Sequence, residues 1–136
     1  MKNIKRVLCL VLTLLMVAST VSVFAAFSDV PTTASYEKAV SALSQLGIIK
    51  GYDDGTFKPD NDVTRAEFTA MLMRTMGAGS IGSSSSADLP FSDVSDQNSD
   101  ISWSIPNINT AYKNGIVNGY EDGTFRPNDK VAYEEA

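Results

Sequence analysis

The chain has 136 residues, with 16 acidic and 11 basic side chains and a formal net charge of −5 at pH 7. This acidic balance excludes the basic face that nucleic-acid-binding proteins present. Because the chain contains no histidine, Ser/His and Cys/His catalysis and the commonest zinc ligand are excluded as well.

The first 25 residues have the pattern of a secretory signal peptide. A basic start (Lys2, Lys5 and Arg6) precedes an apolar run at residues 7–17, and cleavage is predicted after Ala25. An uncleaved signal anchor is the alternative, but the apolar run is shorter than the roughly 20 residues that a membrane span needs. Cleavage would remove the only cysteine and leave 8 basic and 16 acidic residues, a net charge of 8 − 16 = −8.

Phe-Ser-Asp-Val follows near the start of the mature chain at residues 27–30, and a helix is predicted soon after it. Side chains suited to one face of an amphipathic helix recur at spacings of three and four at Tyr36, Ala39, Val40, Leu43 and Leu46. Gly47 follows in the position where a left-handed residue commonly ends a helix.

A glycine turn and a second helix follow. The run GYDDGTF at residues 51–57 is typical of turns, since Asp-Gly tolerates a positive φ. Thr64 and Glu67 then have the spacing of a capping box, which predicts a helix starting there. One face of this helix is expected to carry Phe68, Met71, Leu72 and Thr75, and Gly77 is expected to end it. Core packing is a better explanation of Met71, Met73 and Met76 than a methionine-rich groove.

The same pattern then occurs a second time. A Gly/Ser-rich linker is predicted at residues 78–90, and Phe-Ser-Asp-Val returns at 91–94, followed by GYEDGTF at 119–125. Between them we expect a helix from near Ser104 to Asn114, with an inward face made by Ile105, Ile108, Ala111 and Tyr112. Residues 26–77 and 91–136 are therefore two equivalent modules. The second stops inside its expected last helix, so we interpret the chain as a fragment or the leading part of a larger protein.

These motifs resemble the surface-layer homology (SLH) repeat. The resemblance rests on FSDV, a helix, GI(I/V)xGY(D/E)DGTF(K/R)P and the closing TRAE at residues 64–67, and it covers the mature chain except the linker. It implies a mainly α fold of helix-turn-loop-helix repeats that pack as part of a pseudo-threefold bundle, with ligand grooves between repeats. It also implies non-covalent anchoring of a secreted protein to the bacterial cell wall or S-layer, through a pyruvylated secondary polysaccharide attached to peptidoglycan. Further SLH repeats, of the same or another chain, are the other expected partner.

Arg65 is the leading candidate for binding this glycan. A pyruvate ketal presents a carboxylate, which an arginine can hold in a bidentate, charge-assisted pair. The start of the helix would add its dipole and N–H donors. Arg65 could instead be a solvated surface arginine or pair with a neighbour such as Asp62.

Five further residues are candidate glycan contacts. Asp29 and Asp93 could accept hydrogen bonds from sugar hydroxyls, or they could cap an adjacent turn. Gly51 and Gly119 could allow a ligand or backbone to approach closely, or they could serve a turn that needs a positive φ. Trp103, the only tryptophan, is either a core anchor or a platform for a sugar ring.

The second module departs from the family pattern. Ala132 and Tyr133 stand where the first module has Thr64 and Arg65, so the carboxylate-binding role is not transferred to it. Conversely, the first module has Ser35 at the position where the second module has Trp103.

Two other chemistries fit poorly. A calcium loop with its glycine at Gly55 would place Lys50 and Tyr52 at ligand positions. Acid pairs such as Asp60 and Glu67 are explained by the turn and the capping box. We therefore predict no catalysis, cofactor or metal. The alternatives to glycan anchoring are a structural self-association or lattice role, and a tether for an enzyme further along the chain.

Overall fold

The computed structural model describes residues 27–79 and 85–135. In these ranges the chain is mainly helical and contains no strand, in agreement with the predicted mainly α class, while the pseudo-threefold bundle stays a prediction. The four α-helices are α2 (Glu37–Gln45), α3 (Arg65–Thr75), α4 (Ser99–Ser102) and α5 (Ile105–Lys113), and a 3-10 turn, η1 (Tyr133–Glu135), ends the described chain. None of these helices is long and apolar enough to cross a membrane. The predicted signal peptide and the centre of the linker lie outside the described residues.

The helix boundaries follow the signals in the sequence. Thr64 caps α3 in the predicted capping box: its side chain accepts from the amide of Glu67, while the Glu67 carboxylate accepts from the amide of Thr64. Ser104 precedes α5, with Pro106 in its first turn. The short helix α4 was not predicted, although Asn98 caps it with its side chain.

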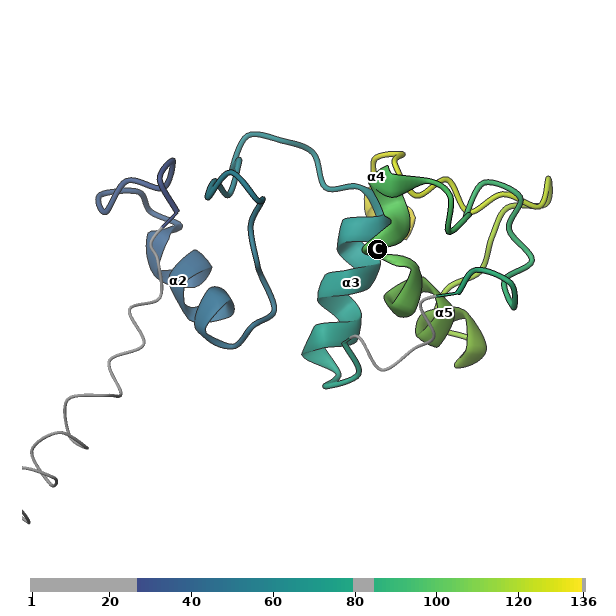
Figure 1. Cartoon of the computed structure of the whole chain (residues 1–136). Coiled ribbons are helices and arrows are strands. Elements are labelled where there is room, and N and C mark those ends of the chain that lie inside the picture. The colour runs from purple at the N-terminus through teal and green to yellow at the C-terminus, as the bar shows by residue number, and fades with distance from the viewer. Residues whose placement is uncertain (1–26, 80–84, 136) are drawn as a thin grey trace, which may run out of the picture.

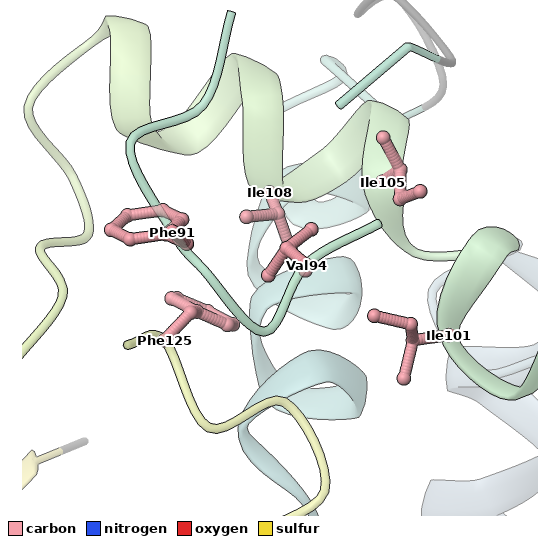
Figure 2. Packing of buried hydrophobic residues seen from close by; sticks show 6 residues of the cluster. All are labelled: Phe91, Val94, Ile101, Ile105, Ile108 and Phe125. Atoms are coloured by element: carbon pink, nitrogen blue, oxygen red, sulfur yellow. The ribbon is translucent and has the colours of Figure 1, made fainter. Parts of the chain in front are cut away.

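The core lies in the second module. It consists of six buried side chains shown in Figure 2: Phe91, Val94, Ile101, Ile105, Ile108 and Phe125. Four of them, including Phe125 at the end of the glycine turn, are fully buried. Fully burying a side chain of this kind stabilises the fold by about 1.5–3 kcal/mol. Tyr112, also predicted to face inward, is half-buried with its ring edge against Phe91.

The first module is packed less well. On α2 only Val40 is buried, whereas Leu43 and Leu46 are exposed, Leu46 at 72% of its surface. Most of the apolar face predicted for this helix is therefore exposed. Part of the reason lies in the sequence, because Glu37 occupies the position equivalent to the core residue Ile105.

Helix α3 belongs to the first module by sequence but packs along α5 of the second, and α2 stands apart from this pair (Figure 1). The buried residues of α3 are Ala66, Thr69, Ala70 and Met73. The face predicted from Phe68, Met71, Leu72 and Thr75 was therefore wrong. Small side chains, rather than the largest ones, let the two helices approach closely. Core packing holds for Met73, whereas Met76 is exposed.

Two side-chain contacts tie α3 back to the first module. The hydroxyl of Tyr52 donates to Oε1 of Glu67 at 2.7 Å, and Nη1 of Arg74 donates to the carbonyl of Ile48 at 3.1 Å. The first contact, together with partial burial, raises the pKa of Tyr52 to about 12. Burial lowers the pKa of Arg74. Helix α3 is thus the element that joins the two modules.

Candidate functional site

In the first module, Asp29 holds the glycine turn. Its Oδ1 accepts from the amide of Phe57 at 2.7 Å, and its Oδ2 accepts from the amide of Lys58 at 2.6 Å. Lys58 has a φ of 57°, a conformation that side chains other than glycine adopt at a cost. Partial burial raises the pKa of Asp29, but the two amide hydrogen bonds outweigh it and leave the pKa below its ordinary value.

The second module repeats this geometry. Asp93 accepts from the amides of Phe125 and Arg126 at 2.8 and 2.7 Å, and Arg126 has a φ of 58°. Both aspartates therefore cap a turn, as one of the two interpretations of the sequence expected. The turn is the one about 30 positions further along the chain, not an adjacent one. Their contact with sugar hydroxyls stays a prediction.

The two candidate glycines lie directly against a phenylalanine of their own module. A Cβ on Gly119 would come within 2.5 Å of the ring of Phe91 and 2.6 Å of the carbonyl oxygen of Thr124. A Cβ on Gly51 would overlap the ring of Phe27 in the same way. Gly51 also has a φ of 68°, whereas Gly119 is not among the glycines with a positive φ. The close approach that these glycines permit in the structure is thus by a side chain of the protein itself.

Arg65 reaches across to the second module. Its Nε donates to the carbonyl of Phe125 at 2.9 Å, and its Nη2 donates to the carbonyl of Asn118 at 3.3 Å. The guanidinium carbon also lies 4.8 Å from the ring centroid of Tyr120 and 5.0 Å from that of Phe125, within cation–π range. The two alternatives to glycan binding, a solvated surface arginine and a pair with a neighbour such as Asp62, do not describe this arrangement. Asp62, proposed as its neighbour, forms an ion pair with Lys130.

The amino end of α3 is also occupied by the second module. The amides of Arg65 and Ala66 donate to the carbonyls of Asp129 and Pro127 at 2.9 and 3.0 Å. The hydroxyl of Thr64 accepts from the amide of Glu67, the next residue of the helix. These N–H groups were expected to be available to an anion, and that expectation was wrong. An anion at this place would have to be bound by the guanidinium instead.

Beside this junction lies a cavity of about 220 Å³. One wall is formed by α3, including its buried residue Thr69, and the other wall is the segment after α5 together with Val131. The lining residues are Arg65, Phe68, Thr69, Leu72, Ile116, Val117, Asn118 and Val131. Its lining combines apolar side chains with the polar groups of Arg65, Thr69 and Asn118, which suits a small organic anion that also carries an apolar group.

Of the six candidate residues, only Arg65 lines this cavity. Trp103 ends α4 with 47% of its surface exposed, and its indole N–H donates to the carbonyl of Asp100 at 3.0 Å. This exposure excludes the interpretation of Trp103 as a core anchor, while its contact with a sugar stays a prediction. The cavity wall from the second module was missed. The signal available for it was the apolar pair Ile116-Val117 beside the glycine turn.

Two modules that each place an aspartate-capped glycine turn after a helix, joined through α3, define a repeat-built protein. The family comparison agrees with this class. The S-layer homology domain matches residues 26–69 and 90–136, and the chain belongs to that family. The family and its surface-protein members indicate a secreted protein associated with the cell envelope.

Three relatives illustrate the range of proteins that contain similar sequences. A cell surface protein of Thermoanaerobacter kivui is 35% identical over the whole chain, which spans 18% of that relative. An endoglucanase of a Bacillus species is 37% identical over 80% of the chain and 10% of the relative. A cellulosome-anchoring protein of Acetivibrio thermocellus is 31% identical over 64% of the chain and 19% of the relative. The chain thus spans less than a fifth of these relatives, and no solved structure is significantly similar to it.

Proposed function

We propose that this chain anchors a secreted bacterial protein non-covalently to the cell envelope, by binding a pyruvylated secondary wall polysaccharide at the junction of α3 and the second module. The observation that carries the proposal is the cavity with Arg65 at its edge. A ketal-linked pyruvate combines a carboxylate with a methyl group, and the cavity offers a guanidinium next to apolar side chains. The membership in the S-layer homology family supports the same function.

The hydrogen bonds of Arg65 suggest how a carboxylate would bind. Its bond to Phe125 is 2.9 Å long, while its bond to Asn118 is 3.3 Å and weaker. A ligand carboxylate would replace the weaker acceptor at Nη2 and leave the stronger bond in place. The guanidinium would then remain positioned by the second module while it binds the glycan. Affinity at one such site would be modest, and several repeats on one protein would raise it by avidity.

The test is co-sedimentation of residues 26–136 with wall sacculi, before and after acid removal of the secondary polysaccharide. We expect binding that disappears on stripping and that falls strongly in Arg65→Lys, which keeps the charge but loses the planar fork. Arg126→Lys is the matched control, because Arg126 also contacts the ring of Tyr120 but does not line the cavity. A folded protein that binds stripped and unstripped sacculi equally would refute the proposal.

A structural role in self-association is the second candidate, and one observation favours it. Leu43 on α2 and Leu46 directly after it are exposed apolar side chains. In this case Leu43→Asp should abolish assembly in sedimentation velocity while glycan binding persists. Arg65→Lys should do the reverse. A tether for a catalytic domain further along the chain is compatible with either candidate, since the endoglucanase relative contains a similar segment.

A further inference from the structure

Four Asn-Gly or Asp-Gly pairs occur in the described chain, and one of them differs from the others. The pairs begin at Asp54, Asn114, Asn118 and Asp122. Such pairs can cyclise spontaneously, because glycine has no side chain to hinder attack by its backbone nitrogen on the preceding side chain. Attack requires that this N–H is not engaged in a hydrogen bond and that the preceding side chain can rotate.

Three of the four pairs are protected by hydrogen bonds. The glycine amides at 55, 115 and 123 each donate to a carbonyl three residues earlier, at 2.9, 2.9 and 3.0 Å. The preceding side chains are held too. Asp54 and Asp122 accept from the neighbouring threonines, and Nδ2 of Asn114 donates to the carbonyl of Thr110 at 2.7 Å.

The pair Asn118-Gly119 has neither protection. Within residues 27–79 and 85–135, the amide of Gly119 donates to no acceptor, and the side-chain amide of Asn118 has no hydrogen-bond partner. Asn118 and Asn114 are both exposed, so accessibility does not distinguish them. The difference between the two Asn-Gly pairs that bears on the attack lies in these hydrogen bonds.

We infer that Asn118 is a site of spontaneous deamidation and that this modification inactivates the cavity. The nitrogen of Gly119 loses its proton to solvent and bonds to Cγ of Asn118. The Cγ–Nδ2 bond then breaks, and the nitrogen leaves as ammonia after taking up a proton. Water opens the resulting cyclic imide at one of its two carbonyls and gives aspartate or isoaspartate. Water is the only co-reactant, and no redox change occurs.

The product changes the wall that faces Arg65. Asn118 lines the cavity, and its main-chain carbonyl accepts from Nη2 of Arg65 at 3.3 Å. Aspartate at this position would add a negative charge that repels a carboxylate ligand. Isoaspartate would insert a methylene into the main chain, which would displace this carbonyl and Gly119, packed against Phe91. This loss of binding rests on the proposed function, whereas the modification itself does not. The first module has Lys50 at the equivalent position and is not subject to it.

The first experiment follows both Asn-Gly sites by peptide mapping and mass spectrometry while residues 26–136 age in neutral buffer. Asn114 has two hydrogen bonds to break at about 1 kcal/mol each, so it should deamidate about 30-fold more slowly than Asn118. In denaturant the two rates should become similar. Equal rates in the folded protein, or faster reaction at Asn114, would overturn the inference.

The second experiment measures sacculus binding by Asn118→Asp, with Asn114→Asp as the matched control. We expect more than about a tenfold loss of affinity for the first variant, from the like charge at close range, and little change for the second. Undiminished binding by Asn118→Asp would refute the inactivation. If fresh, unmodified protein fails to bind, the proposed function fails, and the ratio of the two deamidation rates still decides whether Asn118 is the labile site.

Discussion

Removing the Arg65 side chain should weaken the joint between the two modules. In Arg65→Ala, two hydrogen bonds to main-chain carbonyls and two contacts with aromatic rings are lost. The 2.9 Å bond should contribute about 1.5 kcal/mol, which is the lower end for a charged donor, because Arg65 is half-exposed. The 3.3 Å bond should contribute about half of that. The ring contacts add roughly 0.5 kcal/mol each at a site of this exposure. The expected loss of unfolding free energy is about 3 kcal/mol.

For a domain of roughly 100 residues, this loss corresponds to a fall in Tm of about 12–15 °C, measurable by circular dichroism or calorimetry. Arg65→Lys should lie between the wild type and the alanine variant, because an ammonium group can reach only one of the two carbonyls. Arg126→Ala provides the control: it removes an exposed arginine from the same tyrosine ring and an exposed ion pair with Asp122, and its Tm should fall far less than that of Arg65→Ala. A fall of less than about 3 °C for Arg65→Ala would refute the assignment of Arg65 as the link between the modules.

Four further predictions concern the turns and the cap. Gly119→Ala should destabilise the fold by about 2 kcal/mol in denaturant unfolding, because the new Cβ meets the ring of Phe91 and a backbone oxygen; an unchanged midpoint would contradict this packing. Thr64→Ala should cost about 1 kcal/mol by the same measurement, and a neutral result would mean that the capping box does not stabilise α3. Stability should also fall at both ends of the pH range. The pKa of Tyr52 is raised from 10.0 to about 12, so its contribution is complete below pH 10 and lost as the pH rises to 12, a loss that Tyr52→Phe should not show. The pKa of Asp122 is lowered from 3.8 to about 2 by hydrogen bonds from a threonine and an arginine. Its contribution to folding stability is therefore present above pH 3.8 and lost towards pH 2. Acid unfolding of Asp122→Asn that matches the wild type would contradict this.

The local structure could be predicted from the sequence where one short segment determines it. The capping box at Thr64, the glycines after α2 and α5, and the turns marked by Asp-Gly depend on neighbours a few positions away. Such interactions leave residue types at fixed spacings, and the chain carries the glycine and Asp-Gly signals twice and the capping box once. The helix boundaries were therefore recovered to within a few residues, except at the four-residue helix α4.

The partner of α3 could not be predicted in the same way. Apolar or small residues surround this helix on several sides, so periodicity alone does not indicate which side faces α5. Two rows of residues on this helix have helical spacing. One row is Phe68, Met71 and Leu72, and the other is Ala66, Ala70 and Met73. The structure buries the row with the smaller side chains, because close packing of backbones outweighs the larger apolar area of the other row.

The surroundings of Arg65 were hidden for another reason. Its acceptors are the main-chain carbonyls of Phe125 and Asn118, which every residue type would offer equally. A sequence shows which side chains can form pairs, but it does not show which backbone oxygens will lie at the end of a guanidinium. The candidate arginine was therefore identified from the motif, while the cavity wall opposite it required the fold.

Because α3 is encoded with one repeat and packs on the next, the unit that is duplicated in the sequence is not the unit that folds. A recombination event that exchanges whole repeats between two such proteins would separate α3 from the helix it packs against. The exchanged repeat would bring its own Thr-Arg-Ala-Glu helix to a foreign neighbour and receive a foreign helix in return. Repeats of this type should therefore evolve in adjacent pairs, with compensating changes on the two sides of each junction. A chimera joined after residue 63, just before α3, should be more stable than one joined at the linker.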